Sequence, residues 1–215
     1  MSDGYEILSL DDLERVPQRG SGEVLRPLRR TLGLLALGVN AWSADNAGDK
    51  LIPPHEEDSG HEELYVVVRG TARFTVGDEI QDAPAGTLVH VEPGTFRTAS
   101  AAEPNTMVLA AGGKKGEAYQ VFGWEDVNVA FARLDAGDAA GGRAIMEQNI
   151  HEGEHEWGGH YNLACYLALA GETDAALDEL RIALELNREN VGKWLPHDTD
   201  LDPLRSDPRF EELAQ

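Results

Sequence analysis

The hydrophobic pattern of this chain changes its period once, at the stretch Gly112–Gly116. Before it, from Thr31 to about Gly113, short runs rich in β-branched residues alternate with glycine and proline turns, a pattern typical of a β-sandwich or β-barrel. After Ala118, apolar and small residues recur at helical spacing. We therefore expect an α+β chain, in which a β-barrel is followed by an all-helical domain. The predicted boundaries are residues 1–29 for an N-terminal arm, 30–113 for the β domain and 118–215 for the helical domain.

Two local patterns place strands inside the β domain. The largely apolar run Leu32–Trp42 contains glycines at positions 33 and 38 and predicts a strand. Further along, Gly77-Asp78 separates Val76 from Glu79-Ile80, which predicts the turn of a β-hairpin.

The acidic composition limits the partners that we expect. The 215 residues include 39 Asp and Glu but only 18 Lys and Arg, which gives a net charge of -21 at pH 7. This charge repels phosphate backbones and no basic stripe accumulates, so we expect no nucleic-acid partner. No apolar run approaches the roughly 20 residues of a membrane-spanning helix, so we expect no membrane partner. A single cysteine, Cys165, and an N-terminus without a secretory pattern favour the cytoplasm.

The stretch Pro53–Gly70 joins a polar loop to a buried strand. Its second half, Leu64–Val68, is apolar, rich in β-branched residues and closed by a glycine. Because side chains alternate along a strand, His61, Glu63 and Tyr65 share one face. An imidazole and a carboxylate therefore point the same way at the mouth of the predicted barrel, where they can serve a metal or a polar substrate.

The same stretch resembles the first motif of the cupin superfamily, G-x5-H-x-H-x(3,4)-E-x6-G. Glu63 and Gly70, six residues apart, match the end of this motif. One extra loop residue puts His55 and Glu57 where the H-x-H pair of the family stands. The resemblance implies a cupin barrel, also called a double-stranded β-helix or jelly roll, for the β domain.

The second cupin motif, G-x5-P-x-G-x2-H-x3-N, is also matched in part. Gly86 and Gly94 occupy its glycine positions, but Glu92 replaces its proline and Ala101 its asparagine. Arg97 stands where the family has its last metal-binding histidine. The resemblance therefore implies a barrel whose metal site is altered or lost.

Two chemistries compete for the polar residues of the barrel. Four candidate metal donors are available, and a set of two histidines and one carboxylate would suit one divalent Fe, Mn, Ni or Zn ion; the alternative is a solvated acidic loop. Arg97 could instead hold the carboxylate of a ligand bidentately without metal, or form a salt bridge to a neighbouring glutamate. Tyr65 and His90 are the other candidate ligand-binding residues, although His90 could equally be a packing histidine. The candidate metal donors are His55, Glu57, His61 and Glu63.

The helical domain resembles tetratricopeptide repeats, which have a period of 34 residues. Segments 160–171 and 173–186 predict two helices joined by a turn at Gly171, with small residues at Ala164 and Ala176. Positions 34 residues earlier hold Ala130, Gly137 and Gly142. We predict two repeats, the first degenerate, followed by a closing segment from Trp194.

Two classes of function remain open. In the first, the barrel binds a small molecule while the helical repeats bind a protein partner or another subunit. In the second, the barrel is a metal-dependent enzyme such as an isomerase, lyase or dioxygenase, and its catalytic residues are unknown. No serine nucleophile motif, phosphate loop or dinucleotide fingerprint is present. The cupin resemblance also implies a homodimer, because such barrels commonly pair through their sheets.

Overall fold

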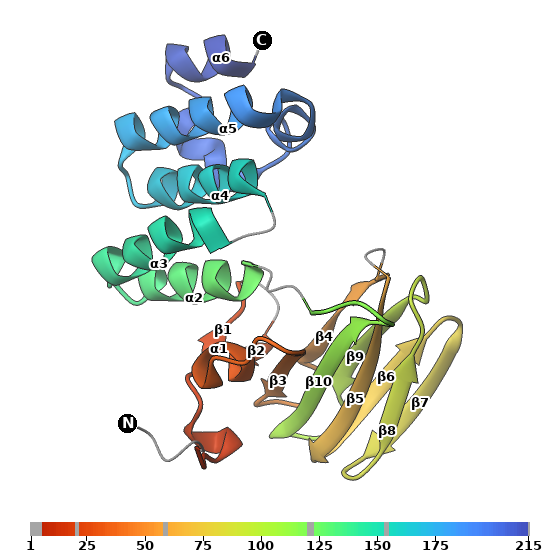
Figure 1. The fold of residues 1–215 in the computed structure, drawn as a ribbon. Coiled ribbons are helices and arrows are strands. Elements are labelled where there is room, and N and C mark those ends of the chain that lie inside the picture. Colours follow the sequence, from red (N-terminus) through yellow and green to blue (C-terminus); the bar gives the residue numbers. More distant parts are fainter. Residues whose placement is uncertain (1–5, 20–21, 58–59, 120–122, 153–154, 215) are drawn as a thin grey trace. The chain divides into compact units, whose positions relative to one another are not determined.

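A computed structural model describes residues 6–19, 22–57, 60–119, 123–152 and 155–214, the side chains of 151 and 152 excepted. The chain forms two compact units, Met1–Gln120 and Val121–Gln215, each described by itself below (Figure 1). In the described residues the strands belong to the first unit and the long helices to the second. This distribution confirms the predicted α+β class. Parts of the predicted N-terminal arm, residues 1–5 and 20–21, lie outside the described residues.

Two antiparallel sheets pack face to face in the first unit (Figure 1). Sheet A has the strand order β1 (Val16–Pro17), β2 (Val24–Arg26), β3 (Gly38–Ala44), β10 (Thr106–Lys114), β5 (His61–Arg69) and β8 (Leu88–Val91). Sheet B has the order β4 (Lys50–His55), β9 (Arg97–Ala101), β6 (Thr71–Val76) and β7 (Glu79–Pro84).

The apolar core of this unit lies between the two sheets. Along β5, Tyr65 and Val67 are 1% and 0% exposed, whereas Leu64 and Val68 on the other face are 40% and 39% exposed. Phe74 of β6 packs against the buried pair from sheet B. Because successive side chains of a strand point to opposite faces, this alternation confirms the predicted strand and its inward face.

The predicted hairpin is confirmed at β6 and β7. Val76 pairs with Glu79 across the turn. Gly77 has φ 56°, a left-handed conformation that glycine adopts at no steric cost.

The predicted strand Leu32–Trp42 is wrong in its first half. Residues Leu28–Leu32 form helix α1, which ends at Gly33 with φ 62°, and β3 begins only at Gly38. Residues 33–37 form an irregular connection in which Leu35 and Leu37 are 69% and 42% exposed, so the apolar run there did not indicate a buried strand.

The N-terminal segment packs on the outer face of sheet A. After the short 3-10 helix η1 (Leu10–Asp12), Leu13 is buried in a small apolar cluster with Val39 of β3. The buried guanidinium of Arg26 donates to the carbonyl oxygens of Leu10 and Leu13 at 3.1 and 3.3 Å. These bonds attach the arm to the sheet and cover the outer face of β3 and β10.

The second unit is a stack of antiparallel helices around one apolar core (Figure 1). Consecutive helices of the stack pack against each other. Within the described residues, none of the helices combines the length and the apolar character that crossing a membrane requires. The elements are α2 (Trp124–Asp135), α3 (Ala139–Glu152), α4 (Glu156–Leu169), α5 (Thr173–Trp194), η2 (Thr199–Leu204) and α6 (Pro208–Ala214).

Residues 34 positions apart occupy equivalent places in this stack. Ala130 in α2 and Ala164 in α4 are both 0% exposed. Gly137 and Gly171 follow the same two helices with φ of 86° and 80°. The left-handed glycine ends each of the two helices in the same way, so the two helix pairs share their turn geometry.

Candidate functional site

Four polar side chains from both sheets meet in the interior of the first unit. His55 is the last residue of β4, Glu63 and Tyr65 lie on the inward face of β5, and Arg97 is the first residue of β9. His55 and Arg97 are paired across β4 and β9. The sequence expectation that Glu63 and Arg97 reach the same place is confirmed by an ion pair between them.

One carboxylate oxygen, Oε2 of Glu63, is the centre of this group. The hydroxyl of Tyr65 donates to it at 2.5 Å. Arg97 Nε lies 3.0 Å away and His55 Nε2 lies 3.5 Å away. Glu63 therefore has two basic side chains and one neutral donor around a single oxygen.

A hydrogen bond to the backbone fixes the orientation of the His55 ring. Its Nδ1 lies 2.7 Å from the carbonyl oxygen of Pro53, which can only accept a hydrogen bond, so Nδ1 carries the proton. Nε2 is thereby turned toward Glu63. Hydrogen bonding with Glu63 is the main cause that raises the pKa of His55 above its ordinary value, against the opposing effect of burial.

The surroundings keep Glu63 ionised and Tyr65 neutral. Burial acts to raise the pKa of Glu63, but hydrogen bonding with His55 and Tyr65 and the charge of Arg97 outweigh it and lower that pKa. Burial, followed by the negative charge of Glu63, raises the pKa of Tyr65. At neutral pH the site therefore contains a carboxylate, a phenol and a guanidinium.

Arg97 is buried without the hydrogen bonds that its charge requires. Its side chain is 0% exposed. Besides the ion pair with Glu63 and the nearby hydroxyl of Tyr65, its three nitrogen atoms have no hydrogen-bond partner of good geometry among the residues that the structure describes. A buried donor left unsatisfied costs about 1–3 kcal/mol, and more when it is charged. The two terminal nitrogens of Arg97 therefore lack the acceptors that a buried guanidinium normally has.

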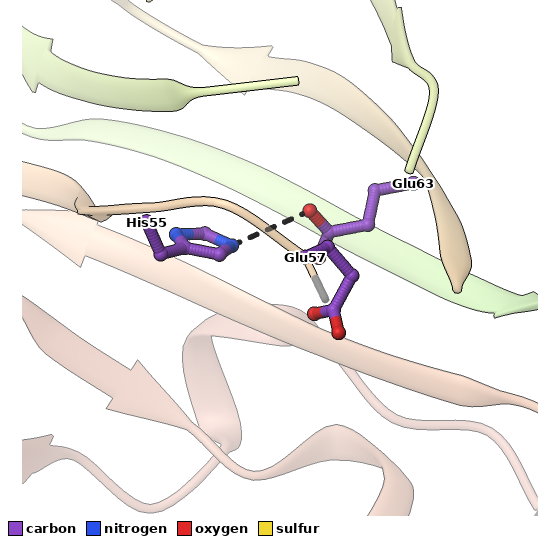
Figure 2. A group of neighbouring side chains, drawn as sticks. All are labelled: His55, Glu57 and Glu63. Carbon is purple, nitrogen blue, oxygen red and sulfur yellow. Dashed lines mark ion pairs between the residues drawn. The ribbon is translucent and has the colours of Figure 1, made fainter. Parts of the chain in front are cut away.

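His55, Glu57 and Glu63 form the candidate metal centre. Each offers one ligand atom, and these atoms lie within 4.8 Å of one another. Figure 2 shows the ring of His55 and the carboxylate of Glu63 pointing toward one another, with Glu57 beside them. One imidazole and two carboxylates are donors that suit divalent Zn, Mn or Fe.

The neighbours of Glu63 count against a metal as the normal occupant. The hydrogen bond from His55 to Pro53 orients a ligating nitrogen, as in many metal sites. Arg97, however, already places a permanent positive charge beside the oxygen that the metal would need. A metal cation bound to that oxygen would be repelled by the positively charged guanidinium of Arg97, which would have to move away. The three donors therefore fit a metal only in part.

Two predicted site residues lie apart from this group. His61 is on the inward side of β5, but its ring neighbours Tyr119, with centroids 6.3 Å apart, and it is not among the three clustered donors. His90 lies on the outer face of β8, where its Nε2 is 3.5 Å from Glu62 and its side chain is 54% exposed. Neither alternative expected for His90, a side chain reaching the interior or a packed one, describes this position.

Asn40 is the polar residue of the interior that sequence reasoning missed. It lies in β3, is 5% exposed, and its Oδ1 accepts no hydrogen bond from the described residues. The signal was an asparagine inside an otherwise apolar segment, which can be seen in the sequence but does not by itself distinguish a turn from a strand.

No protein-family model matches the sequence, and no curated protein matches it. Among solved structures, the chain is similar to a sugar phosphate isomerase from a cupin superfamily of Silicibacter pomeroyi, at 18% identity and TM-score 0.45, over 51% of this chain and 76% of the other. It is similar to a predicted oxalate decarboxylase of Thermotoga maritima, at 14% identity and TM-score 0.41, over 50% and 97% of the two chains. A third similar structure is KdgF from Halomonas sp., at 16% identity and TM-score 0.38, over 48% and 88%.

Proposed function

We propose that the first unit is a cupin-type domain that binds a small organic acid, and that Arg97 holds the carboxylate of this ligand. The observation that carries the proposal is the complete burial of Arg97 together with its unsatisfied terminal nitrogens. A guanidinium presents parallel N–H groups that match the two oxygens of a carboxylate. Such a ligand supplies the hydrogen bonds that the described residues do not.

The charge of the site favours a monocarboxylate over a phosphate. Arg97 and a protonated His55 contribute two positive charges, and Glu63 and the neighbouring Glu57 contribute two negative charges. A carboxylate bound to Arg97 adds one negative charge, whereas a phosphate dianion would add two in an environment of low dielectric constant. Tyr65 remains a phenol and donates a hydrogen bond to Glu63.

We propose a tetratricopeptide-like role in protein interaction for the second unit, with a homodimer as the assembly and the cytoplasm as the location. The equivalent alanines and glycines 34 positions apart support the repeat. Leu64, Val68 and Leu88 are exposed on the outer face of sheet A, and apolar side chains gathered on one face favour a contact between subunits.

The carboxylate proposal is tested with the variant Arg97→Met and with butyrate as the probe. Methionine fills similar space without charge but leaves the carboxylate of Glu63 with only His55 and Tyr65 as partners, so we expect a folded protein with a lowered melting temperature. Two charge-assisted hydrogen bonds are lost, and butyrate binding should weaken by about 100-fold in NMR titrations.

The matched control is Arg73→Met. Arg73 is an exposed arginine on β6 that pairs with Asp82, and it lies outside the proposed site. Its replacement should leave butyrate affinity unchanged. Equal binding by wild type and Arg97→Met, or no binding of butyrate to the wild type, would show that Arg97 is not a carboxylate anchor.

The second candidate function is a metal-dependent enzyme with the ion at His55, Glu57 and Glu63. The three clustered donor atoms favour it. A bound divalent ion would act as a Lewis acid that polarises a substrate oxygen. Elemental analysis of untagged protein purified without chelator tests this candidate, with His55→Gln as the site variant and His90→Gln as the control.

We expect no stoichiometric metal in the wild type. We also expect Arg97→Met to bind added zinc more tightly, because the competing positive charge is gone. A stoichiometric metal that is lost in His55→Gln and retained in His90→Gln would instead establish the enzyme candidate.

A further inference from the structure

We infer that Asn40 is a second recognition residue of the proposed site and that the ligand is a small hydroxy acid. This inference rests on the proposed function, because it assumes that Arg97 holds the carboxylate. It starts from a separate observation, the second buried polar side chain in the same interior with an atom left without a hydrogen bond. Buried polar groups are nearly always satisfied, so such an atom calls for a partner.

The sheet register places Asn40 near the polar group around Glu63. Asn40 pairs with Ala110, and Ala110 pairs with Tyr65, so the three residues form one row across β3, β10 and β5. Trp42, two residues after Asn40, packs into the apolar core between the sheets. By the alternation of side chains along a strand, Asn40 points into the same interior as Tyr65.

The strip of sheet A between Asn40 and Glu63 has small residues at Ala110 and Gly112, while the ring of Tyr119 lies over Gly38. The next row consists of Gly38, Gly112 and Glu63. A Cβ atom added to Gly112 would lie 3.3 Å from Cγ of Glu63, so a side chain there would press on the site. Ala110 is half-buried although it belongs to a central strand and faces inward, which indicates that solvent reaches this strip. A small ligand can lie over Ala110 and Gly112, between the amide of Asn40 and the polar group around Glu63.

The side-chain amide of Asn40 indicates which group the ligand carries besides its carboxylate. Strands are about 4.8 Å apart, so Asn40 and Tyr65 are separated by about 10 Å of backbone, which their side chains shorten. Tyr65 and Arg97 both contact Oε2 of Glu63, so a ligand of a few carbon atoms held by the guanidinium would extend toward the amide. The Oδ1 atom of Asn40 accepts a hydrogen bond and its NH2 group donates, and a hydroxyl can satisfy either, because it is both donor and acceptor.

The test uses ligands with one carbon skeleton: butyrate, the 2-, 3- and 4-hydroxybutyrates, and the corresponding aminobutyrates. In NMR titrations of the full chain, we expect at least one hydroxybutyrate to bind about tenfold tighter than butyrate, the effect of one good hydrogen bond. The variant Asn40→Leu has nearly the same shape without polar atoms. It should fold, bind butyrate as the wild type does, and lose the preference for the hydroxy acid.

The control variant is Ser43→Ala, in the same strand. Ser43 is also buried but accepts a hydrogen bond from Arg26, and we expect the preference to persist there. If butyrate binds through Arg97 but the hydroxybutyrates bind no better, or if Asn40→Leu keeps the preference, the inference about Asn40 is overturned while the carboxylate proposal stands. Tighter binding of an aminobutyrate than of every hydroxybutyrate also overturns it. Failure of all these acids to bind overturns both.

Discussion

At the scale of single residues, His55 and Glu63 link the stability of the site to pH. The pKa of His55 is raised in the folded protein, mainly by hydrogen bonding with Glu63. The protonated pair therefore stabilises the fold fully below the unfolded histidine pKa of about 6.5, and this contribution is lost as pH rises through the raised value. We expect the free energy of unfolding of the wild type to exceed that of His55→Gln most at about pH 6 and progressively less toward pH 9. Denaturant unfolding at several pH values measures this difference.

A double-mutant cycle separates the contribution of the His55–Glu63 pair to the pH dependence of stability from that of other titrating groups. In the Glu63→Gln background the negative charge that raises the histidine pKa is absent. Adding His55→Gln to that background should change the pH dependence of stability much less than it does in the wild type. An equally large change in both backgrounds would mean that Glu63 is not the cause. The lowered pKa of Glu63 affects stability at acidic pH instead. The contribution of the ionised Glu63 to the free energy of unfolding is lost only as pH falls through that lowered value.

At the scale of elements, glycines determine how closely the helices of the second unit pack. A Cβ atom added at Gly142 in α3 would lie 2.6 Å from the carbonyl oxygen of Ala130 in α2. Alanine is about 1 kcal/mol better than glycine inside a helix, but overpacking against a rigid backbone costs about 1–3 kcal/mol. We therefore expect Gly142→Ala to lower the free energy of unfolding by about 1 kcal/mol, measured by chemical denaturation.

Gly192 in α5 provides a control of opposite sign. Apart from its chain neighbours and the backbone of its own helix, a Cβ atom there has no described atom within 4 Å, so only the helical preference of alanine remains. Gly192→Ala should raise the stability by about 0.5–1 kcal/mol. If both substitutions stabilise the protein, α2 and α3 do not require the glycine for their close approach.

At the scale of the whole molecule, the chain combines two units whose interiors differ in polarity. The first unit places charged and polar groups inside a sandwich, where burial strengthens every electrostatic interaction. The second unit has a contiguous apolar core along its helices. The net charge of -21 gives the molecule a strongly acidic character. The buried arginine is the exception to this acidic character, which is why the proposed ligand is an anion.

The local periods in the sequence were sufficient to separate a β unit from a helical unit and to assign the inward face of β5. Side-chain alternation and helical spacing depend only on near neighbours in the chain, so Glu63 and Tyr65 could be assigned to one face. The paired glycines at 137 and 171 could be expected for the same reason. The same rules missed helix α1 and failed at residues 33–37, where an apolar run forms an exposed connection instead of a strand.

The composition of the site was decided only by the tertiary structure. Which residues meet across the two sheets depends on register, and β4 pairs with β9 through two irregularities that no local pattern reveals. These bring His55 beside Arg97 and leave His61 with Tyr119 instead. The strand pattern left open whether His90 reaches the interior or packs, and the structure places it on the outer face with Leu88, which is 64% exposed. The burial of Arg97 and Asn40 likewise follows from the closure of one sheet over the other, because distant strands supply the atoms that cover them.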